Sequence, residues 1–74
     1  MELKYTYKDE VLFTKGSQIV PEIGTKIFFK EMNSKDIKRY VVSEIQEHVS
    51  YSRFSNSYTS DIEVVLVEDI GGLH

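Results

Sequence analysis

Only two imidazoles, His48 and His74, and no cysteine are available for catalysis or metal binding in this chain of 74 residues. Hydrolytic and zinc sites need several convergent His, Cys or carboxylate side chains. Glu44 precedes His48 by one helical turn, but a single pair is too little to predict a site. No serine lies in a Gly-x-Ser-x-Gly elbow, and the glycines are too scattered to form a phosphate loop. We therefore expect a protein that is not an enzyme and holds no cofactor and no metal.

Residues 50–60 differ in composition from the rest of the chain, with the sequence Ser-Tyr-Ser-Arg-Phe-Ser-Asn-Ser-Tyr-Thr-Ser. Aromatic side chains offer large contact areas at low entropic cost, and Ser and Asn offer adaptable hydrogen bonds. Exposed aromatic and Arg side chains are also typical of the centres of protein interfaces. The segment predicts a protein-binding surface made by Tyr51, Arg53, Phe54 and Tyr58. The alternative is an ordinary hairpin with its tip at Asn56-Ser57, where Phe54 and Tyr58 face each other.

A second set of side chains combines positive charge with an aromatic ring. Small barrels bind single-stranded nucleic acid by stacking bases on aromatic rings beside basic groups. The set that could act in this way is Lys26, Phe28, Lys30, Lys38 and Arg39. The simpler interpretation is that the lysines form the solvated side of a strand, because acidic residues interrupt the patch. Nucleic-acid binding is therefore the second hypothesis.

The elements that must position these residues are expected to be strands. The chain has no Ala and four Leu, against eight Val, seven Ile, five Tyr and four Phe, which favours pleated sheet over helix. Residues 21–49 predict a central hairpin, with two β-branched and aromatic runs around a polar break at residues 33–36. Residues 36–49 also fit a helical period, so an α+β fold with a helix there is the alternative. A strand is favoured because consecutive β-branched residues lose side-chain freedom in a helix.

The remaining segments complete a small sheet. Residues 3–8 alternate as a strand with one wet face, and residues 11–13 continue it after either a bend or a hairpin turn. Residues 61–70 have apolar side chains on both faces, which predicts a strand buried on both sides. About five strands in one domain over residues 1–70, with a loose end at 71–74, indicate a compact antiparallel barrel.

The runs Pro21-Glu22-Ile23-Gly24-Thr25-Lys26-Ile27-Phe28, Tyr40-Val41-Val42-Ser43-Glu44-Ile45 and Val64-Val65-Leu66-Val67 resemble those of small Src-homology-3-like β-barrel proteins. Such proteins are common among bacteriophages and other mobile elements. The resemblance covers residues 21–67 and departs at Thr25, where that group often carries Asp or Glu. It implies a barrel that binds protein or nucleic acid. It also implies an accessory or inhibitor protein that acts on a host factor.

Charge and hydropathy limit the kinds of partner that the chain could bind. The net charge is −3, and the last fourteen residues carry four acids and no base. Overall acidity argues against nucleic acid as the main partner. The longest apolar run, residues 64–67, is far too short to span a membrane, and no signal peptide is recognisable. We expect a cytoplasmic protein that binds another protein, of which a second copy forming a homodimer is one form.

Overall fold

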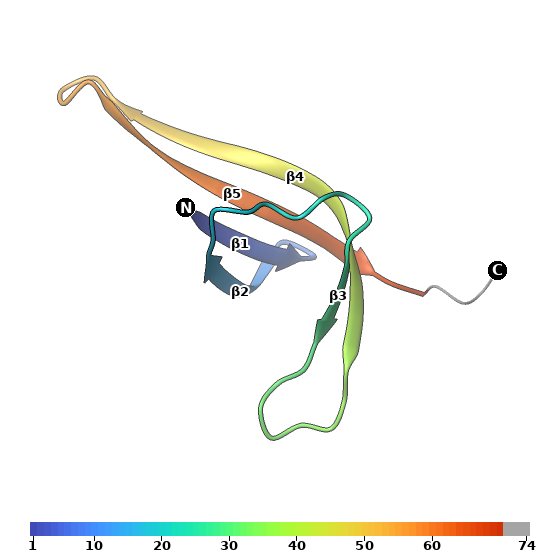
Figure 1. The fold of residues 1–74 in the computed structure, drawn as a ribbon. Helices are drawn as coiled ribbons and strands as arrows, with labels where there is room; N and C mark the ends of the chain where they lie inside the picture. The colour runs from blue at the N-terminus through green and yellow to red at the C-terminus, as the bar shows by residue number, and fades with distance from the viewer. Residues whose placement is uncertain (71–74) are drawn as a thin grey trace.

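The computed structural model describes residues 1–70, and all of its regular secondary structure is β-strand (Figure 1). The strands are β1 (Glu2–Tyr7), β2 (Glu10–Gly16), β3 (Lys26–Phe29), β4 (Lys38–Ser52) and β5 (Ser57–Glu68). The prediction of an all-β chain with about five strands is confirmed. The alternative helix over residues 36–49 is wrong, because β4 runs through nearly all of that segment. The predicted loose end at residues 71–74 lies outside the described residues.

The five strands form one sheet in the order β2-β1-β5-β4-β3. Neighbouring strands are antiparallel except β1 and β5, which run parallel. The prediction of a purely antiparallel sheet is therefore wrong at this pair. Parallel pairing aligns Leu3 with Ile62 and Tyr5 with Val64, so that both strands direct apolar side chains to the same face of the sheet.

Tight turns join or introduce several strands. Lys8 and Asp9 have φ values of 50° and 66°, which is the two-residue turn of a tight hairpin between β1 and β2. The predicted hairpin of β3 and β4 is present, but its connection covers residues 30–37 and is longer than the predicted break. Before β3, Gly24 has a φ of 95° in a turn that the Thr25 amide closes by donating to the Glu22 carbonyl, 3.1 Å away.

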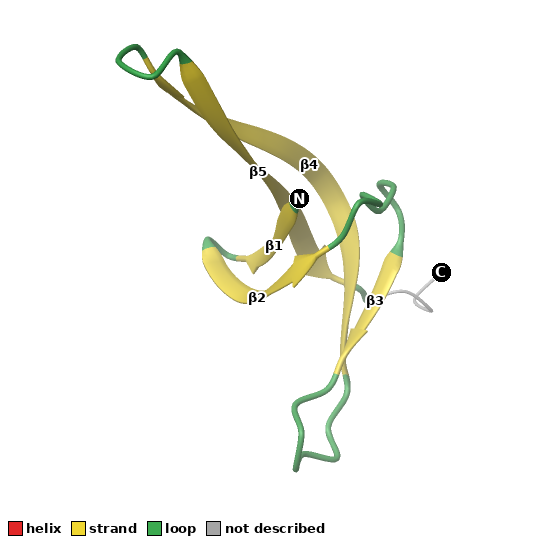
Figure 2. Ribbon diagram, turned by 60° about the vertical axis from the view of Figure 1, so that its left-hand side comes forward, coloured by secondary structure: helices red, strands yellow, loops and turns green. Residues whose placement is uncertain are grey.

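The sheet is curled, and its concave side contains the core (Figure 2). We call this side the core face and the opposite side the outer face. The buried apolar residues of the core face are Leu3, Tyr5, Tyr40, Val42, Ile62, Val64 and Leu66. Phe13 of β2 stacks on Tyr5 with a centroid distance of 4.4 Å and on Phe29 of β3 at 5.7 Å. Aromatic stacking therefore draws the two edge strands together, although no backbone pairing joins β2 to β3 in residues 1–70. The result is a half-barrel.

Within residues 1–70, no second layer covers the outer face. On the core face of β5, Ile62, Val64 and Leu66 are buried, whereas on the outer face Val65 is only half-buried and Val67 is 44% exposed. The prediction that residues 61–70 are buried on both sides is therefore wrong. The sheet uses its concave curvature to cover one face only.

Candidate protein-interaction surface

The strands β4 and β5 extend well beyond the rest of the sheet as a two-stranded ribbon (Figure 1). On one side, β1 pairs with β5 only from Ile62 to Leu66. On the other side, the chain preceding β4 pairs with it only as far as Val42. We call residues 48–61 the arm, since β4 and β5 pair there only with each other, from His48–Asp61 to Ser52–Ser57. The Cα radius of gyration is 14.8 Å, against about 11 Å for a compact domain of this length.

The turn of the arm is formed by residues 53–56, between the closing pair Ser52–Ser57. Asn56 adopts a φ of 51°, a left-handed conformation that Asn tolerates better than most residues. The hydroxyl of Tyr51 donates to Oδ1 of Asn56 across 2.6 Å. The turn is thus held by a side chain of the strand that leads into it.

The aromatic side chains predicted for protein binding gather on this arm. Tyr51 lies directly opposite Tyr58, on the same face as the core, and the two side chains are 61% and 69% exposed. Val49, one pleat nearer to the sheet, is also exposed. A shallow pocket of about 200 Å³ lies between the two strands here, lined by Ser50, Tyr51, Ser52, Ser57, Tyr58 and Thr59. The apolar stripe of the core therefore continues along the arm, past the hydrogen-bonded pair of Glu47 and Ser60, and no other strand of residues 1–70 covers it there.

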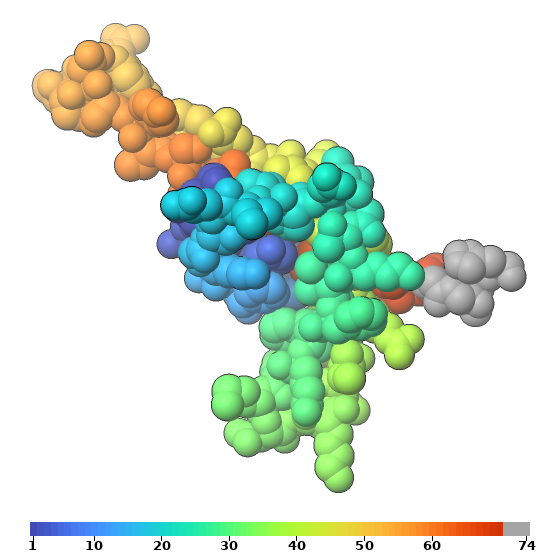
Figure 3. Space-filling model, in the orientation of Figure 1, coloured from blue at the N-terminus to red at the C-terminus, as the bar shows by residue number. Residues whose placement is uncertain are grey.

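The other two predicted residues, Arg53 and Phe54, lie at the turn, where Phe54 is fully exposed. The predicted tip at Asn56-Ser57 is wrong, and Phe54 does not face Tyr58. A two-residue tip would put Asn56 and Ser57 alone at the end, whereas the observed connection takes four residues. The space-filling view shows this end of the chain as a projection (Figure 3). The arm therefore brings Tyr51 and Tyr58 together and places Arg53 and Phe54 beyond them.

The basic and aromatic set is only partly assembled. Phe28 is paired across the strands with Arg39, and Lys26 pairs with Val41 two residues along the same outer face. Phe28 is 64% exposed there. Lys30 follows the end of β3, and Lys38 pairs with Phe29, whose side chain packs against the core. Three members of the set therefore share a face, and Lys38 lies on the opposite one.

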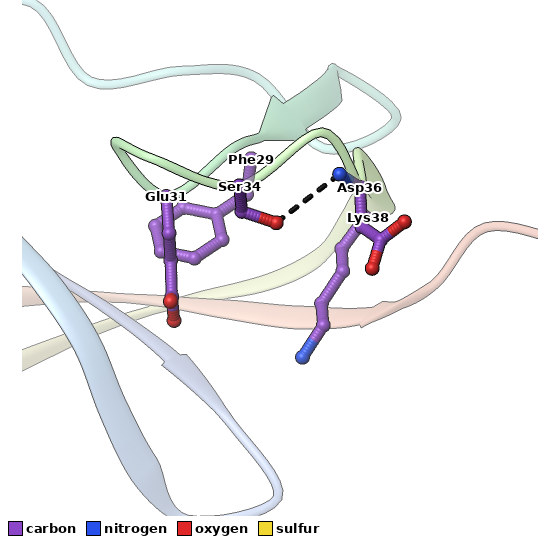
Figure 4. A pocket seen from close by; sticks show the side chains of 5 residues that line it. All are labelled: Phe29, Glu31, Ser34, Asp36 and Lys38. Atoms are coloured by element: carbon purple, nitrogen blue, oxygen red, sulfur yellow. Dashed lines mark hydrogen bonds between the residues drawn. The ribbon is translucent and has the colours of Figure 1, made fainter.

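Lys38 instead lines a pocket of about 220 Å³ together with Phe29, Glu31, Ser34 and Asp36 (Figure 4). The Ser34 hydroxyl oxygen accepts a hydrogen bond from the Asp36 amide at 3.1 Å, which shapes the loop between β3 and β4. Two carboxylates beside one ammonium group make this an unfavourable place for a phosphate. Lys38 is therefore poorly placed to contribute to a nucleic-acid surface.

Sequence reasoning missed a polar network on the outer face. The Thr6 hydroxyl donates to Oε2 of Glu63 across 2.7 Å, and Nε2 of His48 lies 2.9 Å from Oε1 of the same carboxylate. Nearby, the Lys4 ammonium lies 3.7 Å from Asp61. The partner of His48 is Glu63, and not Glu44, whose carboxylate accepts from Gln46 instead. With the turn placed at residues 53–56, the cross-strand register puts Glu63 diagonally across from His48 on the same face, which is the signal that could have suggested this pair.

The hydrogen bond from the Thr6 hydroxyl is the main reason why the pKa of Glu63 lies below its ordinary value. Partial burial raises this pKa, whereas His48 and Lys4 lower it further. Thr6 donates a hydrogen bond to a carboxylate that also contacts His48, and the Thr6 side chain is almost wholly buried. A nucleophile needs its base beside it and an open path to substrate. The network therefore stabilises the sheet instead of forming a catalytic arrangement.

Residues 1–70 contain no group of three or more His, Asp or Glu side chains that could hold a metal ion. The same residues contain no helix long and apolar enough to cross a membrane. No protein-family model matches the chain, and no curated protein or solved structure shows significant similarity to it.

Proposed function

We propose that this chain is a non-enzymatic protein-interaction module that engages its partner through the arm. The observation that carries the proposal is that the apolar stripe of the core face continues past β1 and β3 onto a ribbon that nothing else in residues 1–70 covers. Large exposed aromatic groups on a projecting element are costly in water and typical of interface centres.

The chemistry of the arm favours a protein partner. Between His48 and Asp61 the only charged side chain is Arg53. A ribbon that enters a nucleic-acid groove needs several Lys or Arg side chains to neutralise phosphates. Tyr and Phe interleaved with Ser and Asn instead match the composition of surfaces that bind proteins.

The curled five-stranded sheet supports the small-barrel part of the expected fold. The Src-homology-3-like relationship, and the role of accessory or inhibitor protein acting on a host factor, rest on the resemblance of residues 21–67. A location in the cytoplasm stays a prediction from the sequence.

The proposal is tested by capture of a binding partner from nuclease-treated lysate of the source cells, with the partner then purified and titrated against the chain. We expect the double variant Phe54→Ala/Tyr58→Ala to weaken binding by at least tenfold, since truncation of an aromatic hot-spot residue costs roughly 2 kcal/mol or more. Phe28→Ala is the control, because Phe28 is also an exposed aromatic residue, close to Tyr58 in its exposure, but lies away from the arm. Equal losses for both variants, or none for either, would contradict the assignment of the arm.

Nucleic-acid binding through Lys26, Phe28 and Arg39 is the second candidate, and the cross-strand pairing of Phe28 with Arg39 favours it. In that case single-stranded DNA or RNA should bind with a steep salt dependence, and Lys26→Ala should reduce its slope. Phe54→Ala/Tyr58→Ala should leave that binding unchanged. Capture that disappears on nuclease treatment would move the function to this face.

A further inference from the structure

In the described part of the chain, no strand pairs with the outer edge of β4 over residues 43–52. Up to Val42 the edge is occupied, since the Val42 amide donates to the Thr25 carbonyl at 2.9 Å and its carbonyl accepts from the Gly24 amide at 2.8 Å. Beyond it, the register of β4 shifts at Ser43, and residues 1–70 provide no further strand on this side. Every second residue here directs its backbone N–H and C=O away from β5.

Natural proteins protect such an edge with Pro, charged side chains (Lys above all), bulges or a short strand. Here the bulge at Ser43 and the acids Glu44 and Glu47 lie in the half of the edge nearer to the sheet, and residues 48–52 carry none of these devices. Residues 43–52 contain neither Pro nor Lys, and the edge is one of the longest strands in the chain. Its solvent-exposed backbone groups can therefore form a ladder with another extended chain.

We propose that the partner bound along this edge is a second copy of the chain, an inference that rests on the proposed function of the arm. The two β4 strands would pair antiparallel about a two-fold axis through Ser50. A two-fold interface requires a self-complementary edge. A residue that lies a given number of positions before the axis faces the residue that lies the same number of positions after it in the second copy. With Ser50 opposite Ser50, Val49 lies opposite Tyr51 of the second copy and Glu47 lies opposite Arg53 of the second copy.

Both kinds of pair are favourable, and symmetry forms each of them twice. Val49 and Tyr51 are exposed on the core face of the arm, so their contact would cover part of the uncovered apolar stripe. Glu47 and Arg53 have opposite charges. Moving the axis to His48 or to Ser52 would remove the contact between Glu47 and Arg53. The two-fold at Ser50 is therefore the register in which charge and apolar surface match together.

The proposed register also fits the space along the edge. It places Ser52 of the second copy opposite His48, and the turn at residues 53–56 then reverses the chain, so the second arm ends before Val42. The turn at Glu22–Thr25, which occupies the edge from Val42 onward, is therefore not displaced. The bodies of the two copies would lie at opposite ends of the paired arms.

Cross-linking tests the register, since the chain contains no cysteine of its own. Ser50→Cys should form a disulfide-linked dimer readily with copper–phenanthroline as oxidant, because residues on the axis face each other within disulfide range. Ser52→Cys is the matched control, also exposed and two residues away. Its two copies would be separated by roughly 13 Å along the strands, beyond the limit of about 7 Å for a disulfide. Equal rates for the two variants would overturn the register.

Charge exchange tests the equilibrium by sedimentation velocity from micromolar to near-millimolar concentration. Glu47→Arg and Arg53→Glu should each weaken the dimer by about tenfold, since each puts like charges opposite each other twice. A mixture of the two single variants should associate better than either alone, because both pairs in the mixed dimer are again of opposite charge. Absence of this recovery would contradict the pairing.

A wild-type chain that stays monomeric at near-millimolar concentration would overturn the inference of a second copy. The proposed function would still hold if a purified heterologous partner loses binding on Phe54→Ala/Tyr58→Ala. Conversely, dimerisation with no heterologous capture would identify the second copy as the partner of the arm. Failure of the two proposals therefore gives different results.

Discussion

The two halves of the β4–β5 pair have similar residues on the core face, but these residues are buried in one half and exposed in the other. Val42 and Val49 lie in one strand and point to the same face, yet Val42 is 1% exposed and Val49 is 56% exposed. Val42 is flanked by β5, which β1 covers on its far side, and by the turn before β3, whereas within residues 1–70 Val49 is flanked by β5 alone. Burial in a single-layer sheet therefore depends on which strands flank a position, and not on the residue type there.

This difference in burial assigns folding stability to one region and binding to the other. The half-barrel carries the buried apolar surface that stabilises folding. The arm contributes little burial, and an isolated two-stranded hairpin is marginally stable in water. We therefore expect substitutions to affect stability in the half-barrel and binding in the arm.

Leu66→Ala should lower the free energy of unfolding by about 2–5 kcal/mol, because it removes a fully buried side chain from the core. Val49→Ala on the arm should change it by less than about 0.5 kcal/mol. Urea denaturation followed by far-ultraviolet circular dichroism measures both. Similar losses for the two variants would mean that the arm is covered in solution, for example by a second copy.

Gly24→Ala should cost about 1–2 kcal/mol, because a φ of 95° is unfavourable for a residue with a Cβ atom. The added Cβ would meet no atom within 4 Å, so the cost arises from backbone strain alone. Gly16→Ala is the matched control, since that position is equally open and has no positive φ. If Gly24→Ala were as neutral as Gly16→Ala, the turn at Glu22–Thr25 would not fix the point where the half-barrel ends and the free edge begins.

The sequence predicts the local part of this architecture. Turn residues such as Gly24 and alternating runs such as residues 3–8 act over a few residues, so strands and hairpins follow from them. The parallel pairing of β1 with β5 could not be predicted, because no local turn signals the contact of segments so far apart in the chain.

The candidate site shows the same limit. Composition alone identified Tyr51 and Tyr58, but their register depends on the length of the turn. The four-residue connection with Asn56 in a left-handed conformation moved the partner of Tyr58 from Phe54 to Tyr51. The arm is uncovered because β1 ends its pairing with β5, and β3 its pairing with β4, before the arm begins. The residue pattern of a single strand does not show where its neighbour ends.

Thr6→Val should lower the free energy of unfolding by roughly 1 kcal/mol at neutral pH, since it removes a nearly buried hydrogen bond to the Glu63 carboxylate. The pKa of Glu63 is depressed in the folded state, so this stabilisation is present above the unfolded pKa of about 4.3 and is lost as the pH falls through the lower folded value. Wild type and variant should therefore converge in acid.

Urea denaturation between neutral pH and about pH 3 measures this convergence. Ser60→Ala is the control on the arm, where the hydroxyl donates to Glu47 across 2.7 Å between more exposed side chains, and its cost at neutral pH should be smaller. A gap between wild type and Thr6→Val that is independent of pH would mean that Thr6 acts through packing alone.

Tyr51→Phe should have the smallest effect on global stability, below about 0.5 kcal/mol, because the hydrogen bond from its hydroxyl to Asn56 is exposed to water. Its effect should be local, since that bond ties the turn to the strand leading into it. Amide hydrogen exchange in residues 53–57 should become faster while exchange in β1 stays unchanged. Tyr58→Phe is the matched control, because no hydrogen bond from the Tyr58 hydroxyl is found in the described part of the chain. If Tyr51→Phe also accelerated exchange in β1, the arm and the half-barrel would open as one cooperative unit, and the division between a stabilising region and a binding region would fail.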